Sequence, residues 1–314
     1  MTEAAIDSGS LQGRVLPWDQ PGWLDDVTAW IGKHVELTGP VVRHPRDKPW
    51  SVVARAPTDR GELWFKELGP ALAFEPALTQ ELARHFPRYL PEVLAAEGSR
   101  LLTLHAGRRV SKLRPHDLSS MTGVWESIAA RFAELQIEFV EFGELQAPDF
   151  RPETLGRRFG KRVNHLVEEL GDTIPLSLVH LGVHRNNVCL RDGDWVFLDW
   201  AEAAIGHPFC ALGKPLLNFV RRLGAEPGGP ELLRVRDAYL EPWTILAPSH
   251  ELRAIFKAAY PLGILCGIVA KERVLDSLPA ELYTPELHAH LARQISVTLT
   301  SLAKILRDPD KLGA

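Results

Sequence analysis

Apolar residues recur every three or four positions over the last two thirds of the chain, which is the period of an amphipathic helix. The clearest run, residues 118–139, places Trp125, Ile128, Phe132 and Leu135 on one face. A cluster of glycine and proline at 226–230 predicts a loop within this half. We therefore expect a mostly helical region, with helices at residues 118–139, 152–170, 209–223, 231–247, 250–274 and 282–306.

The first third of the chain has shorter apolar runs between turn residues, which is typical of strands. We expect strands at 36–43, 50–55, 62–68, 93–95 and 101–105. Helical patterns at 21–35 and 70–86 precede the first strand and separate the third from the fourth. The order predicts an α+β protein with a small antiparallel sheet near its N-terminus.

Residues 176–199 interrupt the helical half. A short apolar run, 176–179, leads into a polar loop at 180–187, and the strands 188–191 and 195–198 follow around the turn residues Asp192 and Gly193. Such a hairpin brings Asn187, which precedes its first strand, and Asp199, which follows its second, to the same end. A carboxylate and an amide oxygen suit a hard cation such as Mg²⁺.

This segment resembles the catalytic and metal-binding segments of the aminoglycoside phosphotransferase and choline kinase-like family. The family pattern is His-Gly-Asp-x-His-x-x-Asn, followed by strands and then Asp-Trp or Asp-Phe. Here it reads His-Leu-Gly-Val-His-Arg-Asn-Asn from His180 to Asn187, and Asp199-Trp200 follows. The resemblance implies a two-lobed protein-kinase-like fold that uses ATP and Mg²⁺, with Asn187 and Asp199 as metal ligands.

The same resemblance assigns roles in the first third of the chain. A third-strand lysine that holds nucleotide phosphates corresponds to Lys66, and the helix glutamate that pairs with it corresponds to Glu75. The hinge that contacts the nucleotide corresponds to Thr103, Leu104 and His105. We expect an N-terminal arm at 1–20, a nucleotide-binding lobe at 21–105, and a lobe with the catalytic loop and substrate-binding helices at 106–314.

The catalytic aspartate of the family corresponds to Gly182, which carries no group that can accept the proton of a substrate hydroxyl. Three interpretations stay open: a small-molecule kinase with weakened activity, a pseudokinase that binds nucleotide as a sensor or scaffold, and a substituted variant of an active parent. His184 lies two residues further on, and histidine is the side chain whose unperturbed pKa lies nearest to neutral pH. We interpret His180 and His184 mainly as residues that brace the loop.

Composition and charge limit the classes of partner. The net charge of −4 does not favour nucleic acid or an anionic membrane, and no segment is expected to span a bilayer. Three cysteines in apolar surroundings indicate a reducing compartment, so we expect a cytoplasmic protein. The expected acceptor is a small molecule with a hydroxyl group, an antibiotic or a metabolite. Residues 226–314 carry eleven acidic and ten basic side chains, which argues against a polycationic acceptor. The sequence leaves the oligomeric state open.

Overall fold

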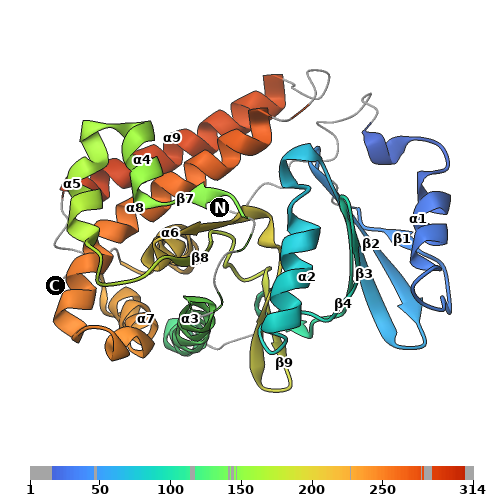
Figure 1. Ribbon diagram of the computed structural model, residues 1–314, viewed down its shortest axis with the longest axis horizontal. Helices are drawn as coiled ribbons and strands as arrows, with labels where there is room; N and C mark the ends of the chain where they lie inside the picture. The colour runs from blue at the N-terminus through green and yellow to red at the C-terminus, as the bar shows by residue number, and fades with distance from the viewer. Residues whose placement is uncertain are drawn as a thin grey trace. The chain divides into compact units, whose positions relative to one another are not determined.

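A computed structural model describes residues 16–45, 48–113, 117–140, 142, 145, 147–226, 228–276, 278 and 285–307 (Figure 1). The chain divides into two compact units. Unit 1 comprises residues 1–107, 190–201 and 271–296, and unit 2 comprises 108–189, 202–270 and 297–314. Most of the predicted N-terminal arm, residues 1–15, lies outside the described residues.

Unit 1 is built on a five-stranded antiparallel sheet. Its strands are β1 (Val42–Arg43), β2 (Ser51–Thr58), β3 (Gly61–Leu68), β4 (Val93–Glu97) and β5 (Arg100–Leu104), in the order β1-β2-β3-β5-β4. Polar turns join β2 to β3 and β4 to β5, as the sequence predicts. The predicted first strand is mostly loop, because only Val42 and Arg43 pair with β2 and Leu37 makes an isolated bridge.

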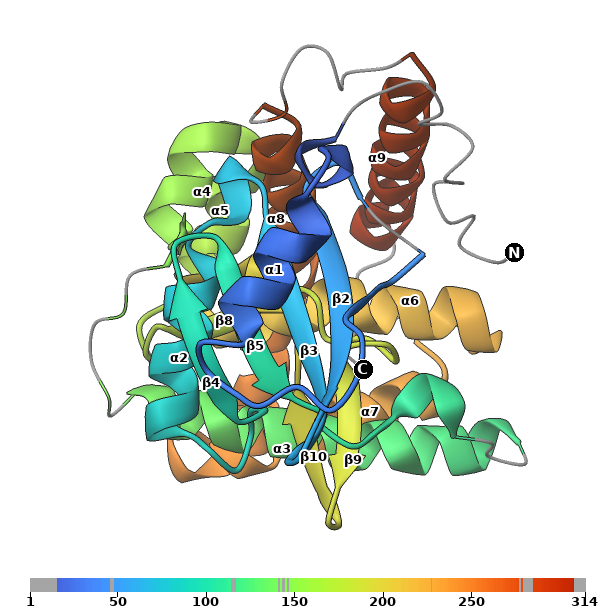
Figure 2. The same cartoon turned by 90° about the vertical axis from the view of Figure 1, so that its right-hand side faces the viewer.

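Helices cover both faces of this sheet (Figures 1 and 2). Helix α1 (Trp23–Ile31) buries Val27, Trp30 and Ile31 against apolar side chains of β2, β3 and β5. Helix α2 (Glu75–His85) lies on the opposite face, next to β4, after the short turn η3 (Pro70–Leu72). The short turn η2 (Pro17–Asp19) buries Trp18, which packs with Leu16 and Val52, so the end of the predicted arm joins the core.

The predicted hairpin is present, with strands β9 (Val188–Arg191) and β10 (Asp194–Phe197). Asp192 and Gly193 both have positive φ, 53° and 92°, as a tight hairpin turn requires. The division between the units falls within β9. In unit 1 the hairpin is fastened to the segment after α2, because Phe197 N donates to Tyr89 O at 2.8 Å and Arg191 donates to Leu90 O at 3.0 Å.

Unit 2 combines helices with a small mixed sheet. Strand β11 (Ala203–Gly206) lies between β8 (Ser177–His180), to which it is antiparallel, and β7 (Asp149–Phe150), to which it is parallel. Helix α3 packs against α7 (Figure 1). The remaining elements are β6 (Arg108–Arg109), η4 (Val110–Lys112), α3 (Leu118–Val140), α4 (Pro152–Phe159), α5 (Lys161–Leu170), η5 (Trp200–Glu202), η6 (Pro208–Leu212), α6 (Gly213–Leu223), α7 (Pro230–Leu240), η7 (Pro242–Ile245), α8 (Ser249–Asp276) and α9 (Pro285–Arg307).

Three predicted helices are interrupted. The expected helix 152–170 breaks at Gly160, whose φ is +64°. The expected helix 231–247 ends at Leu240, because Pro242 cannot continue the hydrogen-bond ladder and begins a short 3₁₀ turn instead. The expected helix 209–223 begins as the 3₁₀ turn η6 before α6. The first break thus lies at a glycine, the second at a proline, and the third where a 3₁₀ turn changes to an α-helix.

Gln136 on α3 fixes the strand that leads into the polar loop. Its buried amide nitrogen donates to Leu178 O on β8 at 2.6 Å and to Pro208 O at 3.2 Å. Its amide oxygen accepts from the hydroxyl of Tyr239 at 2.5 Å, and its main-chain oxygen accepts from Ser177 Oγ at 2.7 Å. One buried amide therefore connects α3, β8, η6 and α7, and β8 ends at the loop.

Helix α8 is long and apolar enough to cross a membrane by length and composition, with a mean hydropathy of 1.5 over its most apolar stretch. Length and composition alone do not show that α8 spans a membrane, so they do not overturn the expectation that no segment does. In addition, 78% of that stretch is buried inside the protein, as in the core helix of a folded unit. This feature is weak evidence for a membrane span.

Candidate active site

Lys66 forms the centre of an ionic cluster in unit 1. It lies on β3, opposite Val53 on β2 and Leu101 on β5. Its Nζ donates to both carboxylate oxygens of Glu75, at 2.8 and 2.6 Å, and to Oδ1 of Asp199 at 2.5 Å. The structure therefore brings together three of the residues that the sequence singles out, from β3, the start of α2 and the segment after β10.

The three side chains differ sharply in their exposure to solvent. The Glu75 side chain is 1% exposed and that of Lys66 is 17% exposed, whereas Asp199 is 45% exposed. Glu75 therefore holds the lysine from the protein interior, where it also accepts a hydrogen bond from the Trp200 main chain. Asp199 is the member of the cluster that a ligand can reach most easily.

Burial and mutual attraction perturb the ionisation of this cluster. Burial raises the pKa of Glu75 to about 7; the positive charge of Lys66 opposes this shift, and the negative charge of Asp199 adds to it. Burial alone lowers the pKa of Lys66, but the two carboxylates outweigh it and raise that pKa above its usual value. Lys66 stays charged at neutral pH, while Glu75 titrates close to it.

Asp199 has an unusual backbone conformation. Its φ is +65°, in the left-handed region that residues other than glycine rarely adopt, although aspartate is among those that tolerate it. Backbone strain of this kind is often found at functional sites, where the surrounding structure maintains it. Here the hydrogen bond to Lys66 holds the Asp199 carboxylate. The next residue, Trp200, is fully buried and fixes the chain directly after Asp199.

The polar loop of unit 2 closes around Gly182. The main-chain nitrogen of Gly182 donates to Nδ1 of His180 at 3.2 Å, and its oxygen accepts from Nδ2 of Asn187 at 3.1 Å. A Cβ atom at position 182 would lie 2.8 Å from Cε1 of His180, whose ring is completely buried. The His180 ring therefore occupies the space next to this glycine, and the loop is packed for a residue without a side chain.

His184 and Asn187 lie in the second half of the loop. Nδ1 of His184 accepts from the main chain of Asn186 at 3.3 Å, and the oxygen of His184 accepts from the main chain of Asn187 at 2.8 Å. Both histidines of the motif thus bond to main-chain groups of the loop, as a bracing role requires. The Asn187 amide also links the two ends of the loop through Gly182.

The predicted hinge residues lie at the end of β5. Thr103 pairs with Trp64 and Val93, and Leu104 N donates to Glu92 O at 2.9 Å. His105 is exposed; its main-chain nitrogen donates to Glu62 O at 3.0 Å. In sheet register, Thr103 lies two residues along β5 from Leu101, the partner of Lys66. The hydrogen bonds of Lys66 to described residues go to Glu75 and Asp199 and to none of these three residues.

The structure also shows an ion pair and an apolar hollow that the sequence did not predict. Glu202 pairs with Lys214 at the start of α6, although no spacing in the sequence links them.

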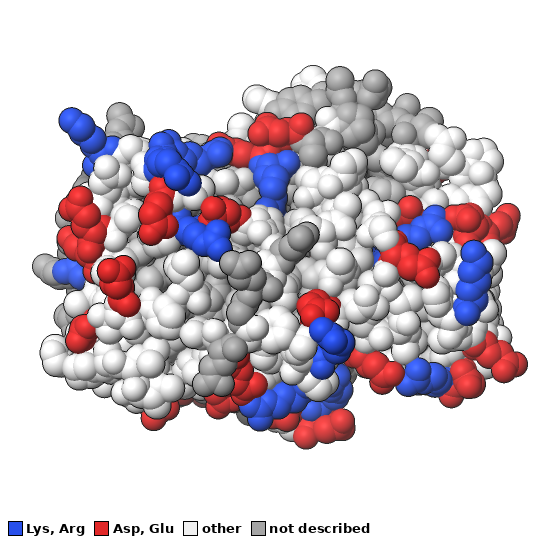
Figure 3. Space-filling view, viewed as in Figure 1, with Lys and Arg blue, Asp and Glu red and all other residues white. Residues whose placement is uncertain are grey.

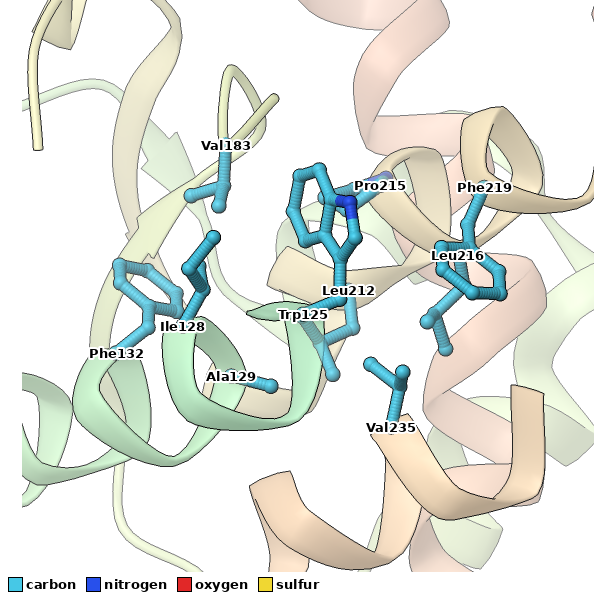
Figure 4. A pocket seen from close by; sticks show the side chains of 10 residues that line it. All are labelled: Trp125, Ile128, Ala129, Phe132, Val183, Leu212, Pro215, Leu216, Phe219 and Val235. Atoms are coloured by element: carbon cyan, nitrogen blue, oxygen red, sulfur yellow. The ribbon is translucent and has the colours of Figure 1, made fainter. Parts of the chain in front are cut away.

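The apolar hollow lies among α3, η6, α6 and α7, and Val183, the residue after Gly182, reaches it from the loop (Figure 4). It is lined only by apolar residues: Trp125, Ile128, Ala129, Phe132, Val183, Leu212, Pro215, Leu216, Phe219 and Val235.

The donor chemistry of these residues fits a divalent metal only in part. Asp199 offers a partly exposed carboxylate and Asn187 an amide oxygen, both hard ligands that Mg²⁺ accepts. Within the described part of the chain, histidine, cysteine, aspartate and glutamate form no group of three that could hold a metal by themselves. A metal at Asp199 therefore needs ligands from another molecule, such as phosphate oxygens and water.

Comparisons with known proteins place the chain in a family and show its fold. A family model described as "Phosphotransferase enzyme family" matches residues 49–248, more than half of the chain. A comparison with curated proteins gives no match.

Several solved structures share the fold. A structure of amicoumacin kinase in complex with AMP-PNP, Ca²⁺ and Ami has a TM-score of 0.57 at 11% identity, covering 87% of this chain and 92% of that one. Choline kinase from Cryptosporidium parvum has a TM-score of 0.55 at 10% identity, with 92% and 98% covered. A putative aminoglycoside phosphotransferase from Ralstonia eutropha has a TM-score of 0.53 at 16% identity, with 89% and 97% covered. These likenesses confirm the predicted α+β kinase-like fold.

Proposed function

The chain belongs to the phosphotransferase enzyme family, and we propose that it is an ATP-dependent phosphotransferase that acts on a hydroxyl group of a small molecule. The observation that carries the proposal is the cluster of Lys66, Glu75 and Asp199. Phosphoryl transfer depends mainly on positioning and on neutralising the charge of the phosphates. A lysine held from the interior by one carboxylate, with a second carboxylate facing solvent, supplies the groups for both tasks.

Each residue has a proposed role. Lys66 binds nucleotide phosphates, and Glu75 fixes its position and charge. Asp199, with the amide oxygen of Asn187, would hold Mg²⁺, which would supply positive charge to neutralise the phosphates. Thr103, Leu104 and His105 contact the nucleotide base. We propose the lobe boundaries expected from the sequence, with residues 21–105 binding nucleotide and 106–314 supplying the loop and the acceptor site.

The family supports a proposal for the cofactor, and the cysteines support one for the compartment. The solved amicoumacin kinase is a complex with a nucleotide analogue and a divalent cation, which supports ATP and Mg²⁺ for this chain. The acceptor is an antibiotic or a metabolite. Cys189, Cys210 and Cys266 are buried and take part in no disulfide, which supports the cytoplasm as the compartment.

A second candidate function rests on Gly182. The loop offers no carboxylate at this position, and the His180 ring fills the adjoining space. A protein that binds nucleotide but does not transfer phosphate, as a sensor or scaffold, is consistent with these observations, and so is a substituted variant of an active kinase. General-base assistance contributes typically about 10²–10⁴-fold to a rate. The native protein is therefore expected to turn over slowly.

Turnover measurements with and without a restored carboxylate test this function. ADP production from Mg-ATP is measured with a panel of sugars, nucleosides, amino alcohols and antibiotics, for the native protein and for Gly182→Asp. We expect Gly182→Asp to raise turnover of the best acceptor by about 10²-fold or more. Because the His180 ring must move to admit the new side chain, rates are compared per mole of folded protein.

The outcomes separate the two functions. A slow native rate that rises in Gly182→Asp supports a kinase with a weakened site. Nucleotide binding without ADP production in either form supports the sensor or scaffold. Kinase-like turnover by the native protein, unchanged in Gly182→Asp, would show that the general base lies elsewhere and that the assignment of position 182 is wrong.

A further inference from the structure

Three cationic residues come from the polar loop of unit 2 and from the segment that packs against it. Arg185 belongs to the loop itself, and Arg108 and Lys112 come from β6 and η4. The main-chain nitrogen of Ser111 donates to the oxygen of Arg185 at 2.8 Å, so η4 lies directly against the loop. All three side chains are exposed. We call Arg108, Lys112 and Arg185 the basic cluster.

The basic cluster carries positive charge that is not paired within the described part of the chain. Among the residues that the structure describes, none of the three forms an ion pair. Elsewhere in unit 2, Lys214 pairs with Glu202 and Arg234 pairs with Glu126. On the face drawn in Figure 3, basic and acidic residues mostly lie side by side. Three exposed cations that form no ion pair with a described residue therefore stand out in a chain whose net charge is −4.

The backbone around the basic cluster is held in place. Nη2 of Arg108 donates to the main-chain oxygen of Lys112 at 3.0 Å, which closes η4 into a compact turn. The loop is held in turn by the bonds of His180, His184 and Asn187 to its main chain. Cations on such a supported frame lose less freedom when they bind an anion than cations on a free segment would.

The distance from Arg185 to Gly182 is within the length of a small molecule. Arg185 lies three residues after Gly182, and three residues of extended chain span at most about 11 Å. A compound with a hydroxyl near Gly182 and an anionic group at Arg185 therefore needs only a few bonds between the two. A planar guanidinium group matches the oxygens of a carboxylate or a phosphate and can bind two of them at once.

We propose that the basic cluster binds an anionic group of the acceptor, a carboxylate or a phosphate, so that the substrates are hydroxy acids or phosphorylated alcohols rather than cationic aminoglycosides or amino alcohols. This inference rests on the proposed function, because it assigns the acceptor of the same loop. The near balance of charge in residues 226–314, where a polycationic acceptor would need carboxylates, agrees with it.

Calorimetry with four probes tests the inference. Glycerate and glycerol 3-phosphate carry the two candidate anions, glycerol carries none, and choline carries a cation. Each is titrated into the full-length protein with and without Mg-ATP. We expect at least one anionic probe to bind about tenfold or more tighter than glycerol and choline, because hydrogen bonds to charged groups are the strong ones. Whichever of glycerate and glycerol 3-phosphate binds more tightly shows whether the site prefers a carboxylate or a phosphate.

A double variant and a matched control locate the site. Lys112→Gln/Arg185→Gln should weaken binding of the anionic probe by about tenfold or more, with unchanged thermal stability and unchanged affinity for Mg-ATP. The control is Arg157→Gln, an exposed arginine of α4 that bonds only to Thr154 Oγ1 among the described residues. It should leave probe binding unchanged.

The failures can be told apart. Equal binding of anionic and neutral probes, or no binding of either anion at tens of millimolar, overturns the inference whatever the nucleotide does. Loss of Mg-ATP affinity in the double variant, with the anionic probe unaffected, also overturns it, because the cluster then serves the nucleotide. A third outcome is that the native protein binds the anionic probe but not Mg-ATP, and that the double variant loses the probe. The inferred anion site would then stand, and the proposed function would be wrong.

Discussion

At the scale of single residues, position 182 shows how closely the loop is packed around glycine. The nearest atom to an added Cβ belongs to the buried ring of His180, at 2.8 Å. We expect Gly182→Ala to lower the free energy of unfolding by about 1–3 kcal/mol, as overpacking typically does. The measurement is urea denaturation, with Gly123→Ala on α3 as the control.

The control variant Gly123→Ala is expected to raise the free energy of unfolding rather than lower it. A Cβ at Gly123 meets only the carboxylate of Glu126, at an ordinary contact distance of 3.9 Å, and alanine favours a helix over glycine by about 0.5–1 kcal/mol. Equal stability of native protein and Gly182→Ala would mean that His180 moves freely. In that case Gly182→Asp would also be accommodated without cost.

The second residue-scale prediction concerns Glu75 and pH. Its folded pKa of about 7 lies above the ordinary glutamate value of 4.5, so its contribution to stability is present below pH 4.5 and is lost as pH rises through 7. The difference corresponds to a loss on the order of 3 kcal/mol. We expect Glu75→Gln to lack this loss, so that it gains stability relative to the native protein between pH 5 and 8.

Denaturant midpoints at several pH values between 5 and 8 measure this difference for the two proteins. The same measurement on Glu81→Gln, an exposed carboxylate on the same helix, is the control. A constant difference between native protein and Glu75→Gln across the range would mean that Lys66 keeps Glu75 ionised throughout. The pKa of Glu75 would then not be raised.

At the scale of elements, glycine determines how closely helix α8 packs. A methyl group on Gly263 would overlap the main-chain oxygen of Cys210 in η6, and one on Gly213 would lie 2.8 Å from the main chain of Gly263. We expect Gly263→Ala to lower the free energy of unfolding by about 3 kcal/mol, at the upper end of the usual cost of overpacking. Thermal or urea denaturation measures it.

Gly267→Ala on the same helix is the matched comparison. Its Cβ would meet only Cδ of Lys214, at an ordinary contact distance of 3.6 Å. The gain in helix propensity, about 0.5–1 kcal/mol, should therefore stabilise the protein. If both variants had the same effect, the close approach of α8 to η6 would not exist in solution.

The sequence predicts elements best where local chemistry decides them. The Asp192-Gly193 turn and the strands around it are correct because a tight turn needs residues that accept positive φ. The helix 152–170 is predicted as continuous, although Gly160 divides it, because hydrophobic spacing continues across the break. Strand β11 was not predicted, since its four residues gain their conformation from pairing with β7 and β8.

At the scale of the whole molecule, the candidate site is only partly readable from the sequence. The order of Lys66, Glu75 and Asp199 along the chain and the family pattern suffice to single them out. The direct bond from Lys66 to Asp199 joins residues 133 positions apart, and no local pattern encodes it. The basic cluster escaped prediction for the same reason, because it depends on the contact between Ser111 and Arg185.

The most direct test of the central claim is calorimetric titration of ATP with and without Mg²⁺ into the native protein, Lys66→Met and Asp199→Ala. If the ionic cluster is the nucleotide site, the native protein binds Mg-ATP, Lys66→Met weakens binding of ATP both with and without metal, and Asp199→Ala abolishes the enhancement by Mg²⁺. No binding at millimolar Mg-ATP, or binding of equal affinity in native protein and Asp199→Ala, would contradict the account.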